Sequence, residues 1–157
     1  MAHTDVEIAP RVAQIVASLA HVEAPLLEIL HTVQREFGCV PDAAKRQIAE
    51  ALNLSRAEVH GVVSFYHDFR AEPAGRHTLK ICRAEACQSM GGEANVRLAQ
   101  QALGVEMGST TADGAVTLEA VYCLGLCACA PSAMLDGRPV GRVDRDVLET
   151  LIVEAQR

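Results

Sequence analysis

The sequence predicts an α/β protein in two parts, with a small helical bundle over residues 1–74 and a mixed α/β domain over residues 75–157. Two observations support this division. As far as about residue 70, apolar residues recur at spacings of three and four, the period of amphipathic helices. Beyond the turn-forming stretch Glu72-Pro73-Ala74-Gly75, strand-like runs alternate with helical ones. We therefore place the domain boundary at this turn.

Four short helices are expected in the first part, and several of their ends carry local signals. Gly38 is typical of a helix C-terminus, and Asn53 is expected to cap the third helix. Ser55-Arg56-Ala57-Glu58 is a capping-box pattern, in which serine and glutamate satisfy the free N–H groups at a helix start. Short helices with brief connections indicate a small bundle. The expected helices cover residues 10–20, 25–37, 41–52 and 55–66.

The second part is expected to form a sheet with helices packed on it. Asp136-Gly137 is a two-residue hairpin signal, and Asp144 is placed to cap the last helix. Residues 104–114 are predicted to be a polar loop with strand-like fragments. The expected strands are residues 77–82, 116–122, 134–136 and 139–143, and the expected helices are residues 92–103 and the segment from residue 144 onward.

Four cysteines in two pairs are the candidate functional residues of the protein. The pairs have the spacings C-x4-C and C-x3-C, and 35 residues separate them. Each pair follows a predicted strand, so each is expected to lie in a loop at a strand end, with the thiols able to converge. Iron–sulfur clusters are held by sets of four cysteine thiolates. The sequence therefore predicts a [2Fe-2S] site with the metal ligands Cys82, Cys87, Cys123 and Cys127.

Three other interpretations of these cysteines stay open. Paired ligands of a structural zinc site are usually separated by about two to four residues, and both spacings here are at the wide end of that range. Disulfides need an oxidising compartment, and no signal peptide is recognised before the cysteines. Buried, inert thiols are the third interpretation, which two pairs in glycine-containing loops match poorly.

The residues around the two pairs favour a cluster. Backbone N–H groups directed at sulfur stabilise the negative charge of a [2Fe-2S] core and help to set its reduction potential. Gly125 allows the backbone to approach closely within the second pair, and Gly91-Gly92 are expected to loosen the backbone after the first. Pro131 directs the backbone out of the second loop, where no N–H donor is required.

Composition and charge exclude several classes of function. A net charge of −6 disfavours nucleic acid binding, which requires clustered lysine and arginine. No apolar run approaches the roughly 18 residues that a membrane-spanning helix needs, and no targeting segment is recognised. We therefore expect a cytoplasmic protein without direct membrane insertion. The sequence has no nucleotide-binding glycine motif, so neither a flavin nor a nicotinamide is expected on it.

The remaining chemistry-bearing residues of the helical part form no recognisable catalytic site. Its histidines are scattered, without the paired spacing of a metal or catalytic motif, so packing or surface roles are expected. Cys39 stands alone and is expected to be a small buried hydrophobic residue. The histidines concerned are His21, His31, His60 and His67.

The two cysteine pairs, with the segment EVHGVVSFYHDFRAEPAGRHTLKIC before them, resemble the thioredoxin-like [2Fe-2S] subunits of NADH dehydrogenase-type complexes. The resemblance runs from about Pro10 to the C-terminus and is most specific in VSFYHDFRAEPAGRH and CLGLCACAPSAMLDG. This family includes the corresponding subunit of respiratory complex I, diaphorase subunits of NAD-reducing hydrogenases and the gamma subunit of NAD-dependent formate dehydrogenases. Within the family, RAEACQSMGG is most similar to the formate dehydrogenase subunits.

This resemblance implies a thioredoxin-like [2Fe-2S] ferredoxin domain over residues 75–157 and an electron-transfer role without an active site on this chain. It implies a neighbouring subunit that carries FMN and binds NAD and, in a formate dehydrogenase, a molybdenum or tungsten catalytic subunit. Residues 1–74 are expected to serve in docking. Cys129 falls outside the family's ligand positions and is expected to pack near the cluster sulfurs without binding iron. The ligand positions match Cys82, Cys87, Cys123 and Cys127.

Overall fold

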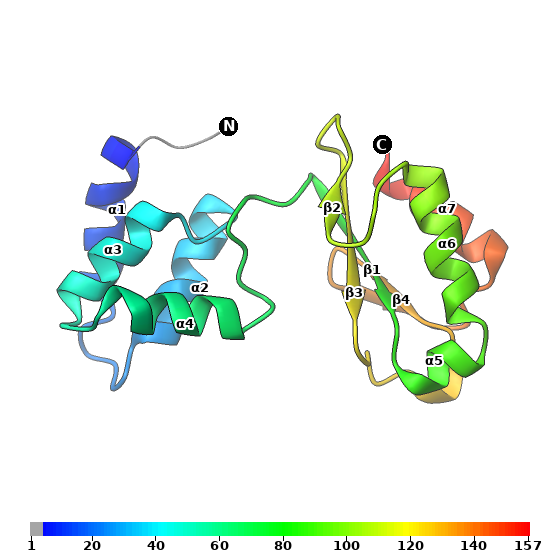
Figure 1. The fold of residues 1–157 in the computed structure, drawn as a ribbon, viewed down its shortest axis with the longest axis horizontal. Coiled ribbons are helices and arrows are strands. Elements are labelled where there is room, and N and C mark those ends of the chain that lie inside the picture. The colour runs from blue at the N-terminus through cyan, green and yellow to red at the C-terminus, as the bar shows by residue number, and fades with distance from the viewer. Residues whose placement is uncertain (1–4) are drawn as a thin grey trace. The chain divides into compact units, whose positions relative to one another are not determined.

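The computed structural model describes residues 5–157, and the protein divides into two units, Met1–Pro73 and Ala74–Arg157. Within residues 5–73, four helices form the first unit (Figure 1): α1 (Asp5–Ser18), α2 (Leu26–Phe37), α3 (Asp42–Ala51) and α4 (Arg56–Phe65). Their apolar faces meet in one core, where Ile29, Leu30 and Ile48 are fully buried. Every helix in the described part of the protein is too short or too polar to cross a membrane.

The local signals at three helix ends are confirmed, whereas α3 is capped by Leu52, and the expected cap Asn53 follows it with a φ of 53°. Gly38 ends α2 in the left-handed conformation, with a φ of 76°. Ser55 accepts a hydrogen bond from the backbone of Glu58, whose side chain accepts one from the backbone of Ser55, as a capping box requires. Asp144 caps the last helix by accepting a hydrogen bond from Val147 N at 3.0 Å. These ends follow from short-range hydrogen bonding, which the sequence shows directly.

The first helix begins at Asp5, whereas the sequence predicts a start at Pro10. Proline lacks an N–H group and is unfavourable inside a helix, which favours Pro10 as the boundary. However, Ile8 is 2% exposed and continues the apolar face of Val12 and Ile15 toward the N-terminus. Burial of this extended face outweighs the cost of one proline near the helix start.

A mixed sheet forms the second unit, with α6 and α7 packed on one face (Figure 1). Over residues 74–157 its strand order is β2-β3-β1-β4-β5. Strands β1 and β3 run parallel, whereas β4 is antiparallel to both β1 and β5. The strands of the sheet and the two helices packed on it are β1 (His77–Cys82), α6 (Gly92–Leu103), β2 (Ser109–Thr110), β3 (Val116–Val121), β4 (Ala133–Leu135), β5 (Arg138–Val140) and α7 (Arg145–Ala155). The predicted α/β sheet with helices packed on it is confirmed.

The core of this unit lies between the sheet and its two helices. Alternate residues of a strand point to one face, so Leu79 and Ile81 of β1 and Leu118 of β3 face the helices together. They pack with Val96 of α6 and Leu148 of α7, and none of these five side chains is more than 3% exposed. This packing holds β1 and β3 rigidly side by side, which matters because the candidate site lies at their ends.

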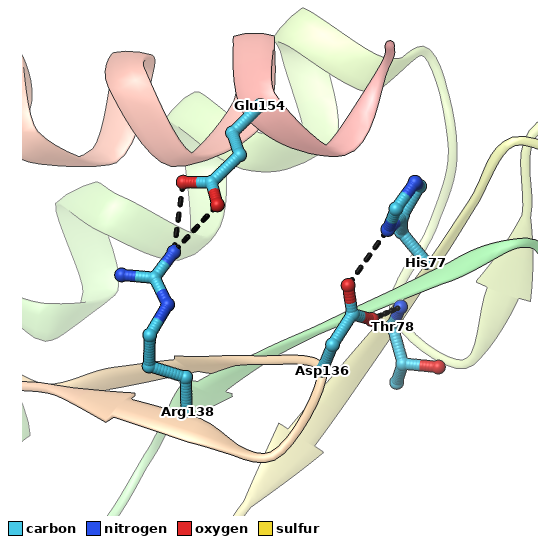
Figure 2. Close-up of polar contacts among 5 residues, drawn as sticks. All are labelled: His77, Thr78, Asp136, Arg138 and Glu154. Carbon is cyan, nitrogen blue, oxygen red and sulfur yellow. Dashed lines mark hydrogen bonds and ion pairs between the residues drawn. The ribbon is translucent and has the colours of Figure 1, made fainter.

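Hydrogen bonds and ion pairs anchor the β4–β5 hairpin at both ends of its turn (Figure 2). Asp136 has a φ of 50°, as the first residue of the predicted two-residue turn requires. Its carboxylate accepts a hydrogen bond from Thr78 N at 2.8 Å and lies 2.7 Å from His77 Nδ1. Arg138 Nη2 donates to both carboxylate oxygens of Glu154, at 2.7 and 2.8 Å. The hairpin is thus tied to the start of β1 and to α7.

Asp136 makes the stability of this unit depend on pH. Burial raises the pKa of its carboxyl group, but hydrogen bonds from His77 and from the Thr78 backbone outweigh burial and hold the pKa below its ordinary value. A carboxyl group with a lowered folded-state pKa stabilises the protein above its unfolded pKa of about 3.9. That contribution is lost as the pH falls through the folded-state value.

We expect Asp136→Asn to lower the free energy of unfolding by about 0.5–1 kcal/mol at neutral pH, since solvent screens a pair that is partly exposed. Asparagine also tolerates positive φ, so the turn is retained and only the charge is lost. The difference from the parent protein should shrink as the pH falls from about 5 to about 2. Urea unfolding followed by circular dichroism measures the free energy of unfolding of both proteins at each pH. A difference between them that stayed constant with pH would contradict this role of the carboxylate.

Candidate metal centre

The two predicted ligand pairs start at the same edge of the sheet. Cys82 is the last residue of β1, and it pairs with Val121, the last residue of the neighbouring parallel strand β3. Cys123 follows β3 by two residues. Because parallel strands end at a common edge, the first thiol of each pair leaves the sheet beside the other. The β1–β3 register therefore starts both cysteine pairs at one edge of the sheet, where the sequence predicts that their thiols can converge.

Cys87 and Cys127 lie on short helical turns. Cys87 lies in α5 (Glu85–Ser89), and Cys127 begins a 3-10 turn that ends at Cys129. The sequence predicts loops at both places, whereas these two residues lie in helical turns. The segments are too short to show a helical period, so only the structure reveals them. A hydrogen-bonded turn fixes the direction of the second thiol in each pair.

The four thiols lie within electrostatic reach of one another. Cys123 Sγ and Cys127 Sγ are 3.7 Å apart. The hydrogen bond and the charge of Cys123 raise the pKa of Cys127, and the charges of Cys87 and Cys82 act in the same direction. Burial raises the pKa of Cys82, but hydrogen bonds, including those from the Cys87 side chain and the Cys123 backbone, outweigh burial and lower it overall. Within residues 5–157, no three His, Cys, Asp or Glu side chains form a single-ion site.

The site is buried on one side and open on the other. Cys82 and Cys87 are each 2% exposed, whereas Cys123 and Cys127 are exposed. Large apolar side chains near both pairs are also exposed, with Met90 after α5 at 62% and Tyr122 before Cys123 at 72%. The second pair therefore forms the solvent-facing side of the thiol group.

The second loop directs a backbone N–H group at sulfur. Gly125 has a φ of 76°, and its N–H group donates to Cys123 Sγ at 3.4 Å. Cys123 itself has a φ of 97°. Such a conformation is uncommon and costly for a residue with a side chain, so the surrounding structure must hold it in place. The close backbone approach that the sequence predicted at Gly125 is confirmed.

The glycine pair after the first two cysteines has a different role from the predicted one. Gly91 caps α6 with a φ of 90°, and Gly92 is the first residue of that helix. A Cβ atom on Gly92 would lie 2.6 Å from the carbonyl oxygen of Cys87 and 3.5 Å from that of Cys82. Gly92 thus lets α6 pack directly against the backbone of the first pair, and it does not loosen the backbone.

The sequence offers little signal for Ser132, which lies against the first pair. Ser132 is 2% exposed, and its Oγ lies 3.4 Å from Cys87 Sγ. Its backbone carbonyl accepts a hydrogen bond from Cys82 N at 3.0 Å. The only hint in the sequence is a single polar residue in an apolar run after Pro131. Its contact with Cys87 depends on the pairing of distant strands.

The other two cysteines have different surroundings. Cys129 is half-buried, and Gly141 packs so closely on it that a Cβ atom on this glycine would lie 2.7 Å from Cys129 Cβ. Cys39 belongs to the first unit and is 6% exposed, which confirms the predicted buried position. Burial raises the pKa of the Cys39 thiol, as expected for an unreactive cysteine. The histidines predicted to have packing or surface roles, His21, His31, His60 and His67, are all exposed.

The donor set fits a [2Fe-2S] cluster, which requires four thiolates. All six cysteines lie in the described part of the protein and are free thiols. Besides the hydrogen-bond donor on Gly125 N, the site has a hydroxyl group on Ser132.

Comparison with known proteins defines the class. The family of thioredoxin-like [2Fe-2S] ferredoxins matches residues 12–156. Since this match covers nearly the whole sequence, the protein belongs to that family, and its cofactor is a [2Fe-2S] cluster.

Two curated relatives show which members it is similar to. The E subunit of the NADH-quinone oxidoreductase of Pseudomonas aeruginosa is 39% identical over 135 residues, which are 84% of this chain and 81% of the relative. The HndA subunit of the NADP-reducing hydrogenase of Solidesulfovibrio fructosivorans is 31% identical over 143 residues, which are 91% of this chain and 84% of the relative. The protein is thus an electron-transfer [2Fe-2S] protein of the kind that these two relatives represent.

A solved structure supports the same fold. The crystal structure of an NAD+-reducing [NiFe]-hydrogenase in the air-oxidized state matches with a TM-score of 0.71 and 27% identity. The match covers 84% of this chain but only 23% of the hydrogenase chain. The present chain therefore corresponds to one part of that longer protein.

Proposed function

We propose that this protein is the one-electron carrier of an NAD-dependent oxidoreductase complex. The observation that carries the proposal is that two pairs of free thiols follow β1 and β3 at the common edge of these two strands. When bound, a [2Fe-2S] cluster takes up and releases single electrons, whereas NADH gives up two electrons as hydride. A flavin must therefore act between them, and we assign FMN and the NAD site to a partner subunit. The proposed cluster ligands are Cys82, Cys87, Cys123 and Cys127.

The protein's own residues position and shield the cluster. The buried thiols of Cys82 and Cys87 exclude water on one side, while Cys123 and Cys127 face outward. Electrons are exchanged with the partner through this open side, where the exposed Tyr122 offers an apolar contact.

Residues 1–74 are proposed to dock the protein in its complex. One feature of the first unit, an exposed pair of aromatic side chains, supports this role. Phe65 and Tyr66, at the end of α4, are 73% and 44% exposed and pack edge to face with ring centroids 5.1 Å apart. Exposed aromatic residues are enriched at protein interfaces, where they supply much of the contact area.

Within this class we infer an NAD-dependent formate dehydrogenase, in which a molybdenum or tungsten subunit oxidises formate. The support is the first cysteine loop, RAEACQSMGG, which resembles the gamma subunits of those enzymes. The alternatives are a subunit of complex I and a subunit of an NAD-reducing hydrogenase, and the relatives named above favour these two.

Metal and sulfide analysis of the anaerobically purified protein tests the cofactor and its role. We expect about two iron atoms and about two acid-labile sulfides per molecule, with the red-brown colour of a cluster. Dithionite should reduce it and produce the electron paramagnetic resonance (EPR) signal of a reduced diiron cluster. NADH alone should not reduce it, because we assign the flavin to a partner subunit. Zinc without sulfide would instead support a zinc-stapled interaction module and overturn the proposal.

Affinity purification of the tagged protein from its native cells tests the identity of the complex. We expect it to copurify with a flavoprotein and a molybdenum- or tungsten-containing subunit, and the complex to reduce NAD+ with formate. The same preparation should be assayed with hydrogen and NAD+, and with NADH and a quinone. Activity only with hydrogen, or only with a quinone, would replace formate dehydrogenase with the corresponding alternative.

A further inference from the structure

We propose that the Ser132 hydroxyl group donates a hydrogen bond to the thiolate of Cys87 and thereby raises the reduction potential of the cluster. This inference rests on the proposed function, because it takes Cys87 as a cluster ligand. Ser132 is then a residue that tunes the cofactor without binding iron.

The sheet holds Ser132 in place beside the first pair. Ala133 pairs with Ile81 in the antiparallel β1–β4 ladder. The Ser132 carbonyl extends this ladder by one residue, since it accepts a hydrogen bond from Cys82 N at 3.0 Å. Moving Ser132 would therefore disturb the end of β1, from which the first ligand leaves. This backbone position brings Ser132 Oγ to 3.4 Å from Cys87 Sγ.

Chemistry determines which atom of this contact is the donor. A cysteine that binds iron has lost its proton, so its sulfur can only accept. The serine hydroxyl is then the donor, because it carries the only available hydrogen. Both residues are 2% exposed, so water does not compete for either group. A hydrogen bond to a charged acceptor in a dry site is stronger than one between neutral groups.

The donor favours the reduced cluster. If the cluster took up one electron from the partner's flavin, no bond would be made or broken, and the hydroxyl proton would stay on Ser132 Oγ. The added negative charge would be shared by the sulfur ligands, and a fixed donor binds a more negative sulfur more strongly. Removing the hydroxyl group therefore destabilises the reduced cluster more than the oxidised cluster, and the reduction potential falls.

Ser132→Ala and Ser132→Thr in the full-length protein test this inference. Anaerobic titration with dithionite and redox mediators, followed by EPR, gives the midpoint potential. We expect Ser132→Ala to keep its iron and to have an equilibrium constant for reduction about tenfold lower than the parent protein. For a one-electron couple this corresponds to a midpoint potential about 59 mV lower. Ser132→Thr retains the hydroxyl group and should stay near the parent value. Ser89→Ala is the matched control, since the exposed Ser89 hydroxyl donates to Ala86 O at 3.0 Å.

The outcomes separate this inference from the proposed function. An unchanged potential in a fully loaded Ser132→Ala protein would overturn the role of Ser132 and leave the function intact. Absence of iron and sulfide from the parent protein would overturn the function itself. If Ser132→Ala fails to load, Ser132→Thr and Ser132→Val form a second comparison, because their side chains have the same shape and differ by the hydroxyl group. Equal potentials in that pair would contradict the proposal.

Discussion

Replacing Cys127 with alanine is expected to remove most of the iron, whereas replacing Cys129 should leave about two iron atoms per molecule. Four thiolates complete a [2Fe-2S] site, so the loss of one ligand is severe and the loss of a fifth cysteine is not. The two cysteines have different contacts in the structure. Cys127 Sγ lies 3.7 Å from Cys123 Sγ. Cys129 is instead anchored beside Gly141, and its carbonyl accepts a hydrogen bond from Arg142 N at 2.6 Å.

Iron and sulfide analysis, with EPR of the reduced proteins, distinguishes the two cysteines. Cys129→Ala should show full iron content and at most a modest shift in potential. A weak, altered signal in Cys127→Ala that disappears in the double variant would mean that Cys129 can replace the lost ligand. Iron lost from Cys129→Ala but retained in Cys127→Ala would show that the fourth ligand is wrongly assigned.

Gly92→Ala is expected to impair cluster binding although it changes no ligand. The added Cβ atom would lie 2.6 Å from the carbonyl oxygen of Cys87 and 3.0 Å from its carbonyl carbon. Backbone atoms cannot rotate out of the way as a flexible side chain does, so either α6 or the Cys87 segment must shift. Overpacking of this kind costs about 1–3 kcal/mol. We therefore expect lower thermal stability and faster loss of iron to a chelator.

Gly61→Ala provides the matched control for this prediction. Gly61 lies in α4, and a Cβ atom there would have no neighbour within 4 Å. Alanine is the better helix former, so this variant should be more stable by about 0.5–1 kcal/mol and should bind iron normally. Chelator kinetics for Gly92→Ala that matched those of Gly61→Ala would show that close packing at Gly92 is not required for cluster binding.

The sequence predicts well those features that depend on neighbouring residues. The capping box at Ser55, the left-handed end of α2 at Gly38 and the hairpin turn at Asp136 each depend on a few consecutive residues. The sequence predicts strand β1 and helix α6 with the ends that the structure shows, since both carry clear apolar periods. The sequence places each cysteine pair after a strand, which allows the thiols to converge, but the parallel pairing of β1 and β3 that starts both pairs at one edge comes from the structure.

Features that depend on contacts between distant residues could not be predicted from local pattern. Ser132 meets Cys87 across 45 positions, because β4 pairs with β1. Gly92 resembles an ordinary turn glycine until the Cys87 carbonyl is seen beside it. The five residues of α5 are too few to show a helical period. In each case tertiary packing, rather than local preference, determines what the residue does.

The unequal burial of the two cysteine pairs has a consequence for handling the protein without its cluster. Reagents in solution reach Cys123 and Cys127 first, since Cys82 and Cys87 are each 2% exposed. Oxidation and alkylation of thiols follow exposure as well as ionisation. Air should therefore oxidise cluster-free protein first at Cys123 and Cys127. Adding a thiol reductant before iron and sulfide should then increase the fraction of a stored sample that can be reloaded with a cluster.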